Sequence, residues 1–281
     1  MEQRITPQTL RAFAVWLAAE ERSPATIEKY LRDAARFRRY LAGCPVSKES
    51  LLRWKEHLLT EEGCAPVTVN SMLAAVHQLF RCMGRQELRV SYVREQRRIF
   101  REPRRELTRQ DYQRLLDAAR SHRQERLSLL LETMASTGIR VSEVHAITVE
   151  AARAGCAEIA LKGKLRRILL PKRLCRKLLK YAEKQKTASG EIFLTKGGRG
   201  LDRRRIWAEL KALARRAGVE ASRVFPHNLR HLFAVTFHKA CGDIAKLADV
   251  LGHASIETTR IYLISSGTEH ERLLERLGLV T

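Results

Sequence analysis

The second half of the chain contains short motifs whose side chains are suited to binding and attacking a phosphate group. Arg140 lies in T-G-I-R-V-S-E, just after Gly138, and a glycine can adopt the left-handed turn that ends a helix. A guanidinium fixed in such a bend can bind two oxygens of one phosphate. Alone, the motif is more typical of a surface arginine that follows a helix.

A second motif, F-P-H-N-L-R-H, places a histidine and an arginine in the first turn of a helix that Pro226 opens. His227 and Arg230 are three residues apart, so they share a face at the helix end that favours anions. An imidazole and a cation there suit attack at phosphorus. The alternative is a zinc pair of His227 and His231, although no H-E-x-x-H motif is present.

Three further motifs are ambiguous when each is taken alone. His253 follows L-G at a predicted helix end, where a histidine often caps or packs. Tyr262 ends T-T-R-I-Y, and a tyrosine at helical spacing is more often a core residue than a nucleophile. Lys162 lies in the turn K-G-K-L-R-R of a predicted hairpin, where a lysine is usually solvated.

Helices are predicted to form the first part of the chain and to carry most of its basic residues. Caps or prolines at Thr6-Pro7, Ser23-Pro24, Ser47 and Pro66 open four amphipathic segments, which suggests a small four-helix bundle. Five arginines share their outer faces: Arg32, Arg36, Arg38, Arg39 and Arg53. Such a stripe is either a solvated face or a DNA contact.

The pattern divides the chain into residues 1–93, a basic linker at 94–106 and a second domain at 107–281. Thr108 and Asp111 resemble a capping box, and the only strand-like region is a hairpin of residues 157–161 and 167–170. A third short strand is expected near 147–149. Helices are expected at 174–184, 206–217, 227–238 and 244–251, and from near Ser255 and His270. The fold class is therefore mainly α with a small antiparallel sheet.

The composition favours a polyanionic partner. Among 281 residues, 53 Lys and Arg face 31 Asp and Glu, which gives a formal charge of +22. Nucleic acid is the leading candidate, an anionic membrane surface is second, and a merely soluble basic protein is the alternative. No apolar run approaches the ~18 residues of a membrane span. Six scattered cysteines without a C-x-x-C pair suggest buried free thiols and a reducing, cytoplasmic location.

The order and spacing of the motifs are more specific than any one of them. T-G-I-R-V-S-E, a hairpin lysine, H-N-L-R-H, L-G-H and T-T-R-I-Y, from residue 137 to residue 262, strongly resemble the tyrosine recombinase (phage integrase) family. The first part is similar to the core-binding domain of this family in its helix count and in S-P-A-T-I-E-K-Y-L-R-D. The resemblance therefore implies a helical core-binding bundle followed by a catalytic domain.

The resemblance also implies a role for each motif. Arg140 and Arg230 would hold the non-bridging oxygens of the scissile phosphate, and His253 would add another contact. His227 would bind the phosphate and accept the proton of Tyr262, which would attack to form a 3′-phosphotyrosine.

Two more assignments concern the hairpin and a buried acid. Lys162 would protonate the departing 5′ oxygen, but the usual K-G-x-K-x-R is one residue shorter here, so Lys164 remains an alternative. Glu143 would support the active-site arginine and histidine. Preorganised donors and a covalent intermediate make this chemistry independent of metal and ATP, and we expect no cofactor.

The implied activity is site-specific DNA strand exchange, either by a mobile-element integrase or by a resident Xer-like recombinase. The expected partners are double-stranded DNA with an inverted-repeat core site and three further copies of the chain, which form a homotetramer on two duplexes. An amphipathic segment at 269–279 could dock into a neighbouring protomer. The alternatives are a type IB-like topoisomerase and a non-catalytic DNA-binding regulator.

Overall fold

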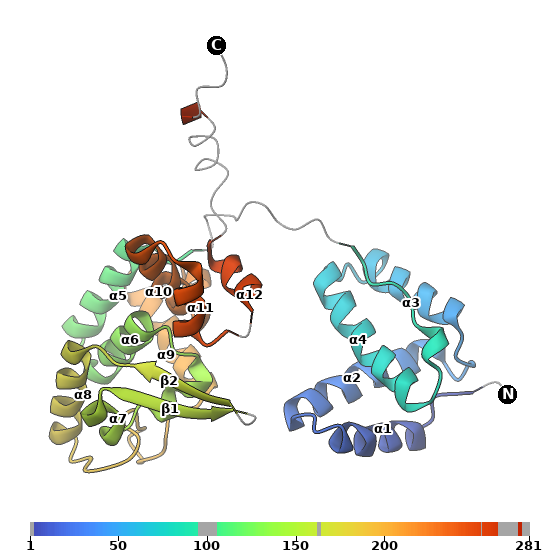
Figure 1. Cartoon of the computed structure of the whole chain (residues 1–281), viewed down its shortest axis with the longest axis horizontal. Coiled ribbons are helices and arrows are strands. Elements are labelled where there is room, and N and C mark those ends of the chain that lie inside the picture. The colour runs from blue at the N-terminus through green and yellow to red at the C-terminus, as the bar shows by residue number, and fades with distance from the viewer. Residues whose placement is uncertain (1–2, 95–105, 162–163, 254, 264–274, 277–281) are drawn as a thin grey trace. The chain divides into compact units, whose positions relative to one another are not determined.

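The computed structural model describes residues 3–94, 106–161, 164–253, 255–263 and 275–276, with only the backbone at 160–161, 164–165 and 263. The chain divides into two compact units, residues 1–97 and residues 98–281 (Figure 1). None of the described helices is both long and apolar enough to span a membrane.

Unit 1 is built from four helices: α1 (Pro7–Ala19), α2 (Pro24–Leu41), α3 (Lys48–Thr60) and α4 (Pro66–Cys82). Three of them begin as the sequence predicts, because Thr6, Ser23 and Ser47 each accept a hydrogen bond from the backbone three residues on. Apolar residues at helical spacing meet in one core, where the ring centroids of Phe37 and Trp54 are 4.9 Å apart.

In its described residues outside 275–276, unit 2 packs eight α-helices and a hairpin, most of them around a second core. Its helices are α5 (Arg109–Ser121), α6 (Glu125–Thr137), α7 (Val149–Ala154), α8 (Lys172–Lys184), α9 (Arg203–Arg216), α10 (Pro226–Cys241), α11 (Ile244–Leu251) and α12 (Ile256–Arg260). Leu130, Leu131 and Met134 of α6 are fully buried in this core. The helices α10 and α11 also share a smaller apolar cluster with Tyr262. Strands β1 (Cys156–Leu161) and β2 (Lys164–Leu169) pair antiparallel, with Ile159 opposite Arg166. The mainly helical class with a small antiparallel sheet is confirmed.

Two local expectations are wrong. Residues 147–149 form no strand, because Thr148 caps α7 and makes only an isolated bridge to Glu191. All six cysteines are free, but only Cys175 is buried. The helix expected from near His270 falls mainly outside the described residues, of which 275–276 are helical.

Candidate active site

A glycine turn at the end of α6 positions Arg140. Gly138 has a φ of 61°. A Cβ atom there would lie 2.5 Å from Phe233 Cδ1 and 2.9 Å from Leu251 Cδ2, so no larger side chain fits without movement. Arg140 follows at the start of the 3-10 helix η3 (Val141–Ala146), and its side chain is 37% exposed. The turn therefore presents this guanidinium at the surface.

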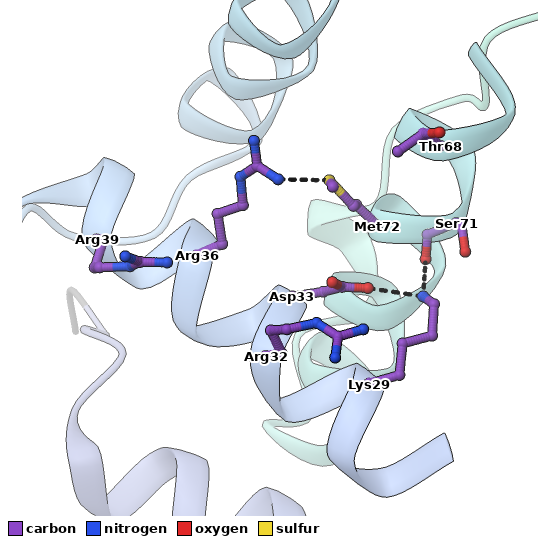
Figure 2. A pocket seen from close by; sticks show the side chains of 8 residues that line it. All are labelled: Lys29, Arg32, Asp33, Arg36, Arg39, Thr68, Ser71 and Met72. Carbon is purple, nitrogen blue, oxygen red and sulfur yellow. Dashed lines mark hydrogen bonds and ion pairs between the residues drawn. The ribbon is translucent and has the colours of Figure 1, made fainter. Parts of the chain in front are cut away.

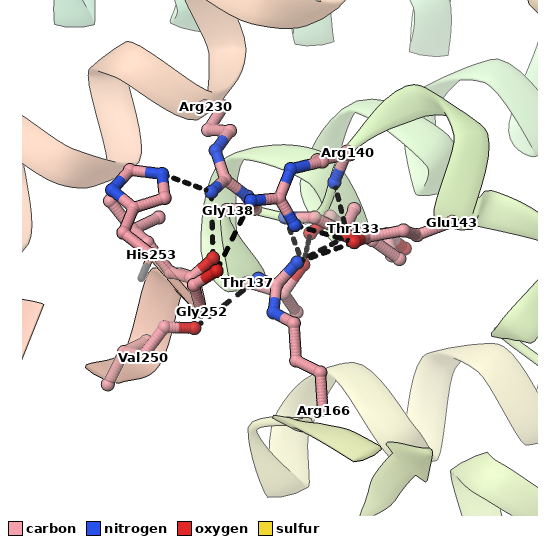
Figure 3. Close-up of polar contacts among 12 residues, drawn as sticks. Thr133, Thr137, Gly138, Arg140, Glu143, Arg166, Arg230, Val250, Gly252 and His253 are labelled. Carbon is pink, nitrogen blue, oxygen red and sulfur yellow. Dashed lines mark hydrogen bonds and ion pairs between the residues drawn. The ribbon is translucent and has the colours of Figure 1, made fainter. Parts of the chain in front are cut away.

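The carboxylate of Glu143 connects two arginines (Figure 3). One oxygen accepts the Arg140 backbone N–H at 2.9 Å, and the other accepts Arg140 Nη1 at 2.8 Å. Arg166 Nη1 donates to both oxygens, at 2.7 and 2.6 Å. Burial alone would raise the pKa of Glu143, but the hydrogen bonds from Arg140 and the charge of Arg166 hold that pKa below its ordinary value. The acid is therefore an anion that aligns both guanidinium groups.

Arg230 lies in the first turn of α10, which begins at Pro226, and only 3% of it is exposed. Its N–H groups donate to the carbonyl oxygens of Gly138 and of Leu251, the latter at 2.8 Å. Burial lowers the pKa of Arg230 to about 10, and the charge of Arg140 adds to this effect. This guanidinium thus stands close to Arg140 with its charge only partly offset by backbone oxygens.

His253 links the second arginine to the segment that carries the tyrosine. Its Nε2 lies 2.8 Å from Arg230 Nη2 and, because a guanidinium only donates, this nitrogen accepts. The proton is therefore on Nδ1, which donates to Thr259 Oγ1 at 2.8 Å. Burial lowers the pKa of His253 to about 4, helped first by the charge of Arg230, so the ring is neutral near pH 7.

Tyr262 is 6% exposed and lies among three imidazole rings. It belongs to the 3-10 helix η5 (Ile261–Leu263), which follows α12 directly. The centroid of its ring is 5.4 Å from that of His227, 5.6 Å from that of His231 and 5.8 Å from that of His253. Tyr262 also interacts with Arg230, where it partly opposes the lowering of the arginine pKa. The candidate nucleophile is therefore buried among the candidate catalytic groups.

The structure brings together five of the six sequence-predicted site residues: Arg140, His227, Arg230, His253 and Tyr262. The sixth, Lys162, lies outside the described residues, and of Lys164 only the backbone at the start of β2 is described. The described residues contain no group of three or more histidine, cysteine or acidic side chains that could hold a metal ion. His231, the other half of the zinc alternative, instead faces Tyr262 and lies 3.5 Å from Glu106 Oε1.

Sequence reasoning missed two further members of this cluster, Arg166 and Thr259. Thr259 is fully buried and fixes the tautomer of His253. In the sequence it belongs to T-T-R-I-Y, a motif from which only Tyr262 was assigned a role. Arg166 takes the last position of the shortened K-G-x-K-x-R hairpin motif, but no role was assigned to it from the sequence. Among the described residues, the cluster holds three guanidinium groups, those of Arg140, Arg166 and Arg230, and the carboxylate that bonds to them is that of Glu143. Such a surplus of positive charge suits an anion with several oxygens, for example a phosphodiester.

Comparison with known proteins identifies the family. The sequence model of the phage integrase family matches residues 105–268, more than half of the chain. The chain belongs to the phage integrase family. The resemblance inferred from the motifs is thus confirmed.

Relatives match this chain along most of its length. Tyrosine recombinase XerA of Thermococcus kodakarensis is 29% identical over 96% of this chain and 97% of the relative. Tyrosine recombinase XerD of Brucella suis biovar 1 is 30% identical over 84% of this chain and 85% of the relative. The chain is therefore a tyrosine-type site-specific DNA recombinase, and the topoisomerase and regulator alternatives are not favoured.

Solved structures of integrases share the fold at low sequence identity. A lambda integrase dimer bound to a COC' core site has a TM-score of 0.72 at 17% identity, covering 92% of this chain and 94% of that one. The Tn1549 transposon integrase in complex with transposon right end DNA has a TM-score of 0.71 at 15% identity, covering 96% and 99%.

Proposed function

We propose that the chain recombines DNA by transesterification at a single phosphodiester, with no metal ion and no ATP. The oxygen of Tyr262 attacks phosphorus and forms a 3′-phosphotyrosine bond, while the bond from phosphorus to the 5′ oxygen breaks. His227 accepts the phenolic proton, and Lys162, with Lys164 as the alternative, protonates the departing oxygen. In the second half of the reaction, a 5′ hydroxyl of the partner strand displaces the tyrosine and the phosphodiester is restored.

The arginines and His253 supply the electrostatic part of this reaction. Arg140 and Arg230 bind the non-bridging oxygens, whose negative charge grows as the attacking oxygen approaches. His253 adds a further contact once the neighbouring guanidinium turns to the phosphate. The observation that carries the proposal is the meeting of Tyr262 with three imidazoles and a buried arginine, because these groups come from distant parts of the sequence.

A basic pocket between α2 and α4 supports a DNA-binding role for unit 1, which we propose to be the core-binding domain of residues 1–93. Its volume is about 360 Å³, and its lining combines four cations with one acid and three other side chains: Lys29, Arg32, Asp33, Arg36, Arg39, Thr68, Ser71 and Met72. Lys29 is held by Asp33 at 2.7 Å and by the Ser71 carbonyl oxygen at 3.1 Å.

Two other cations of this pocket are better placed for phosphate, whereas Arg36 is paired with Glu62. Figure 2 shows no bond from Arg32 or Arg39 to the other lining residues. We therefore assign them to contacts with the DNA backbone, which positions a protein without specifying sequence. In this proposal the linker of residues 94–106 joins the bundle to the catalytic domain of residues 107–281.

We further propose that four copies assemble on two duplexes that carry inverted-repeat core sites, as either a mobile-element integrase or a resident Xer-like enzyme. The segment 269–279 would then dock into a neighbouring copy, although most of it lies outside the described residues. A cytoplasmic location follows from the DNA substrate. Removal of the residues after Gly267 should abolish strand exchange while DNA binding persists, and unchanged exchange would refute the docking role.

Covalent trapping on nicked DNA tests the chemistry. The substrate is a duplex that carries the inverted repeats found beside the gene of this protein. A nick close to the cleavage site releases a short fragment with the leaving 5′ hydroxyl, so the covalent adduct cannot be rejoined. The native chain should form a protein–DNA adduct resistant to denaturing gel electrophoresis, and Tyr262→Phe should form none while it still binds DNA. Tyr181→Phe is the matched control, because this tyrosine is buried in α8, and it should trap normally. Normal trapping by Tyr262→Phe would overturn the assignment.

A further inference from the structure

Strand β2 turns one of two adjacent arginines into the protein and the other to solvent. Successive side chains of a strand alternate between its faces. Arg166 is paired with Ile159, which is buried, and its own side chain is only 10% exposed. Arg167 is 65% exposed and forms an ion pair with Glu158 at 2.7 Å. Only Arg166 thus has a placement that needs explanation.

The inward arginine contacts two of the segments that hold the phosphate-binding groups, the one that carries Arg140 and the one that precedes His253. Its Nη1 donates to both oxygens of Glu143, and its Nη2 lies 3.4 Å from the carbonyl oxygen of Val250. Its aliphatic stem crosses Gly252, where an added Cβ atom would lie 2.5 Å from both Cδ and Nε of the arginine (Figure 3). One side chain thereby joins the hairpin, η3 and the turn before His253.

This placement is energetically costly. Burial lowers the pKa of Arg166 and the nearby Arg140 adds repulsion, while the charge of Glu143 only partly opposes the two. Its Nε is buried with no hydrogen-bond partner among the described residues. An apolar side chain of similar volume would avoid both costs. The ion pair with Glu143 therefore serves a purpose other than stabilising the fold.

We propose that Arg166 is a positioning residue for catalysis, an inference that rests on the proposed function. Its Nη1 holds both oxygens of the Glu143 carboxylate, which in turn orients the Arg140 guanidinium toward the scissile phosphate. It also fixes β2, and so the hairpin on which the candidate lysines lie, against the turn that precedes His253. Arg166 acts through these groups and does not itself touch the phosphate.

Trapping on the nicked duplex, measured as a rate at saturating DNA, tests this role. Arg166→Met keeps the stem and removes the guanidinium, and it should slow adduct formation at least about tenfold, as expected for a misoriented positioning group. Arg166→Lys keeps the charge but lacks the second nitrogen, which lies by the Val250 carbonyl oxygen, and should recover only part of the rate. Arg167→Met is the matched control from the neighbouring position and should stay within about twofold of the native rate.

A methylphosphonate at the scissile position separates positioning from folding. This neutral group replaces one charged oxygen, so the reaction depends less on the Arg140 guanidinium. If Arg166 acts through Arg140, the defect of Arg166→Met and that of Arg166→Lys should both shrink on this substrate. In an Arg140→Ala background, Arg166→Met should add little further loss.

The possible results distinguish a failure of the Arg166 inference from a failure of the proposed function. The inference is overturned if Arg166→Met reacts at the native rate on the phosphate substrate. It is also overturned if the defect of each variant is as large on the methylphosphonate as on the phosphate. If the native chain forms no adduct, or Tyr262→Phe still forms one, the proposed function fails instead. If Arg166→Met has no thermal transition and is therefore unfolded, the test rests on Arg166→Lys. Its defect should then be smaller on the methylphosphonate than on the phosphate substrate.

Discussion

Replacement of Gly138 by alanine tests how the end of α6 holds the arginine cluster. The residue combines a positive φ of 61° with close neighbours, since a Cβ atom would lie 2.5 Å from Phe233. Left-handed backbone costs an alanine about 1–2 kcal/mol, and overpacking a filled site typically costs about 1–3 kcal/mol more. We therefore expect Gly138→Ala to lower the free energy of unfolding of unit 2 by about 2–5 kcal/mol.

Gly155 provides the control that isolates the packing contribution. It also ends a helix in left-handed backbone, with a φ of 74°, but an added Cβ atom there would meet nothing within 4 Å. Gly155→Ala should therefore cost only the backbone part, about 1–2 kcal/mol. In differential scanning calorimetry of the full chain, the unit 2 transition of Gly138→Ala should lie at least about 2 °C below that of Gly155→Ala.

Two results would refute this reasoning. Equal transition temperatures for the two variants would mean that the side chains of Phe233 and Leu251 move aside without loss of folding free energy. A shift confined to the transition of unit 1 would place the effect in the wrong unit. Trapping adds a second readout, because the Gly138 carbonyl oxygen accepts a hydrogen bond from Arg230. A displaced turn should slow adduct formation by Gly138→Ala more than by Gly155→Ala.

Three further predictions concern other groups. Thr259→Val removes the acceptor of the His253 Nδ1 proton and should cost about 1–3 kcal/mol in urea unfolding, whereas an unchanged midpoint would contradict the assigned tautomer. Because folding lowers the pKa of His253 from 6.5 to about 4, its contribution to stability is present above pH 6.5 and is lost as the pH falls toward 4. The native transition temperature should therefore drop more between pH 7 and pH 4.5 than that of His253→Gln; parallel curves would argue against the shift. Arg32→Gln combined with Arg39→Gln should reduce the slope of log K against log salt by about 2 in fluorescence anisotropy with duplex DNA, and an unaltered slope would remove both from the phosphate contacts.

Local signals predicted most of the helical fold. Capping residues such as Thr6, Ser23 and Thr108 act within one turn, so their effect can be inferred from the sequence alone. The failure at 147–149 has the same local origin. Thr148 is β-branched and suits a strand, but its hydroxyl accepts the Ala151 N–H, and the chain enters α7 instead.

The site could be predicted only in part. Arg140, His227, Arg230, His253 and Tyr262 stand in motifs whose order is distinctive, so they could be found together without coordinates.

Arg166 could not be found in this way, because its role depends on strand register. A shift of one residue would exchange it with Arg167, and a sequence with two adjacent arginines does not say which one faces inward. The bond from His253 to Thr259 likewise depends on how two helices meet, not on their spacing.

The burial of Tyr262 bears on how the enzyme treats the rest of the genome. With only 6% of this residue exposed, a duplex that merely touches the protein finds no phenolic oxygen within reach. We therefore expect strand breakage to require a local movement that brings a phosphate to the phenolic oxygen while His227 and Arg230 stay beside it. We therefore expect DNA that is bound by charge alone to be cut less often than the target site, because such binding does not by itself bring a phosphate to the buried phenol.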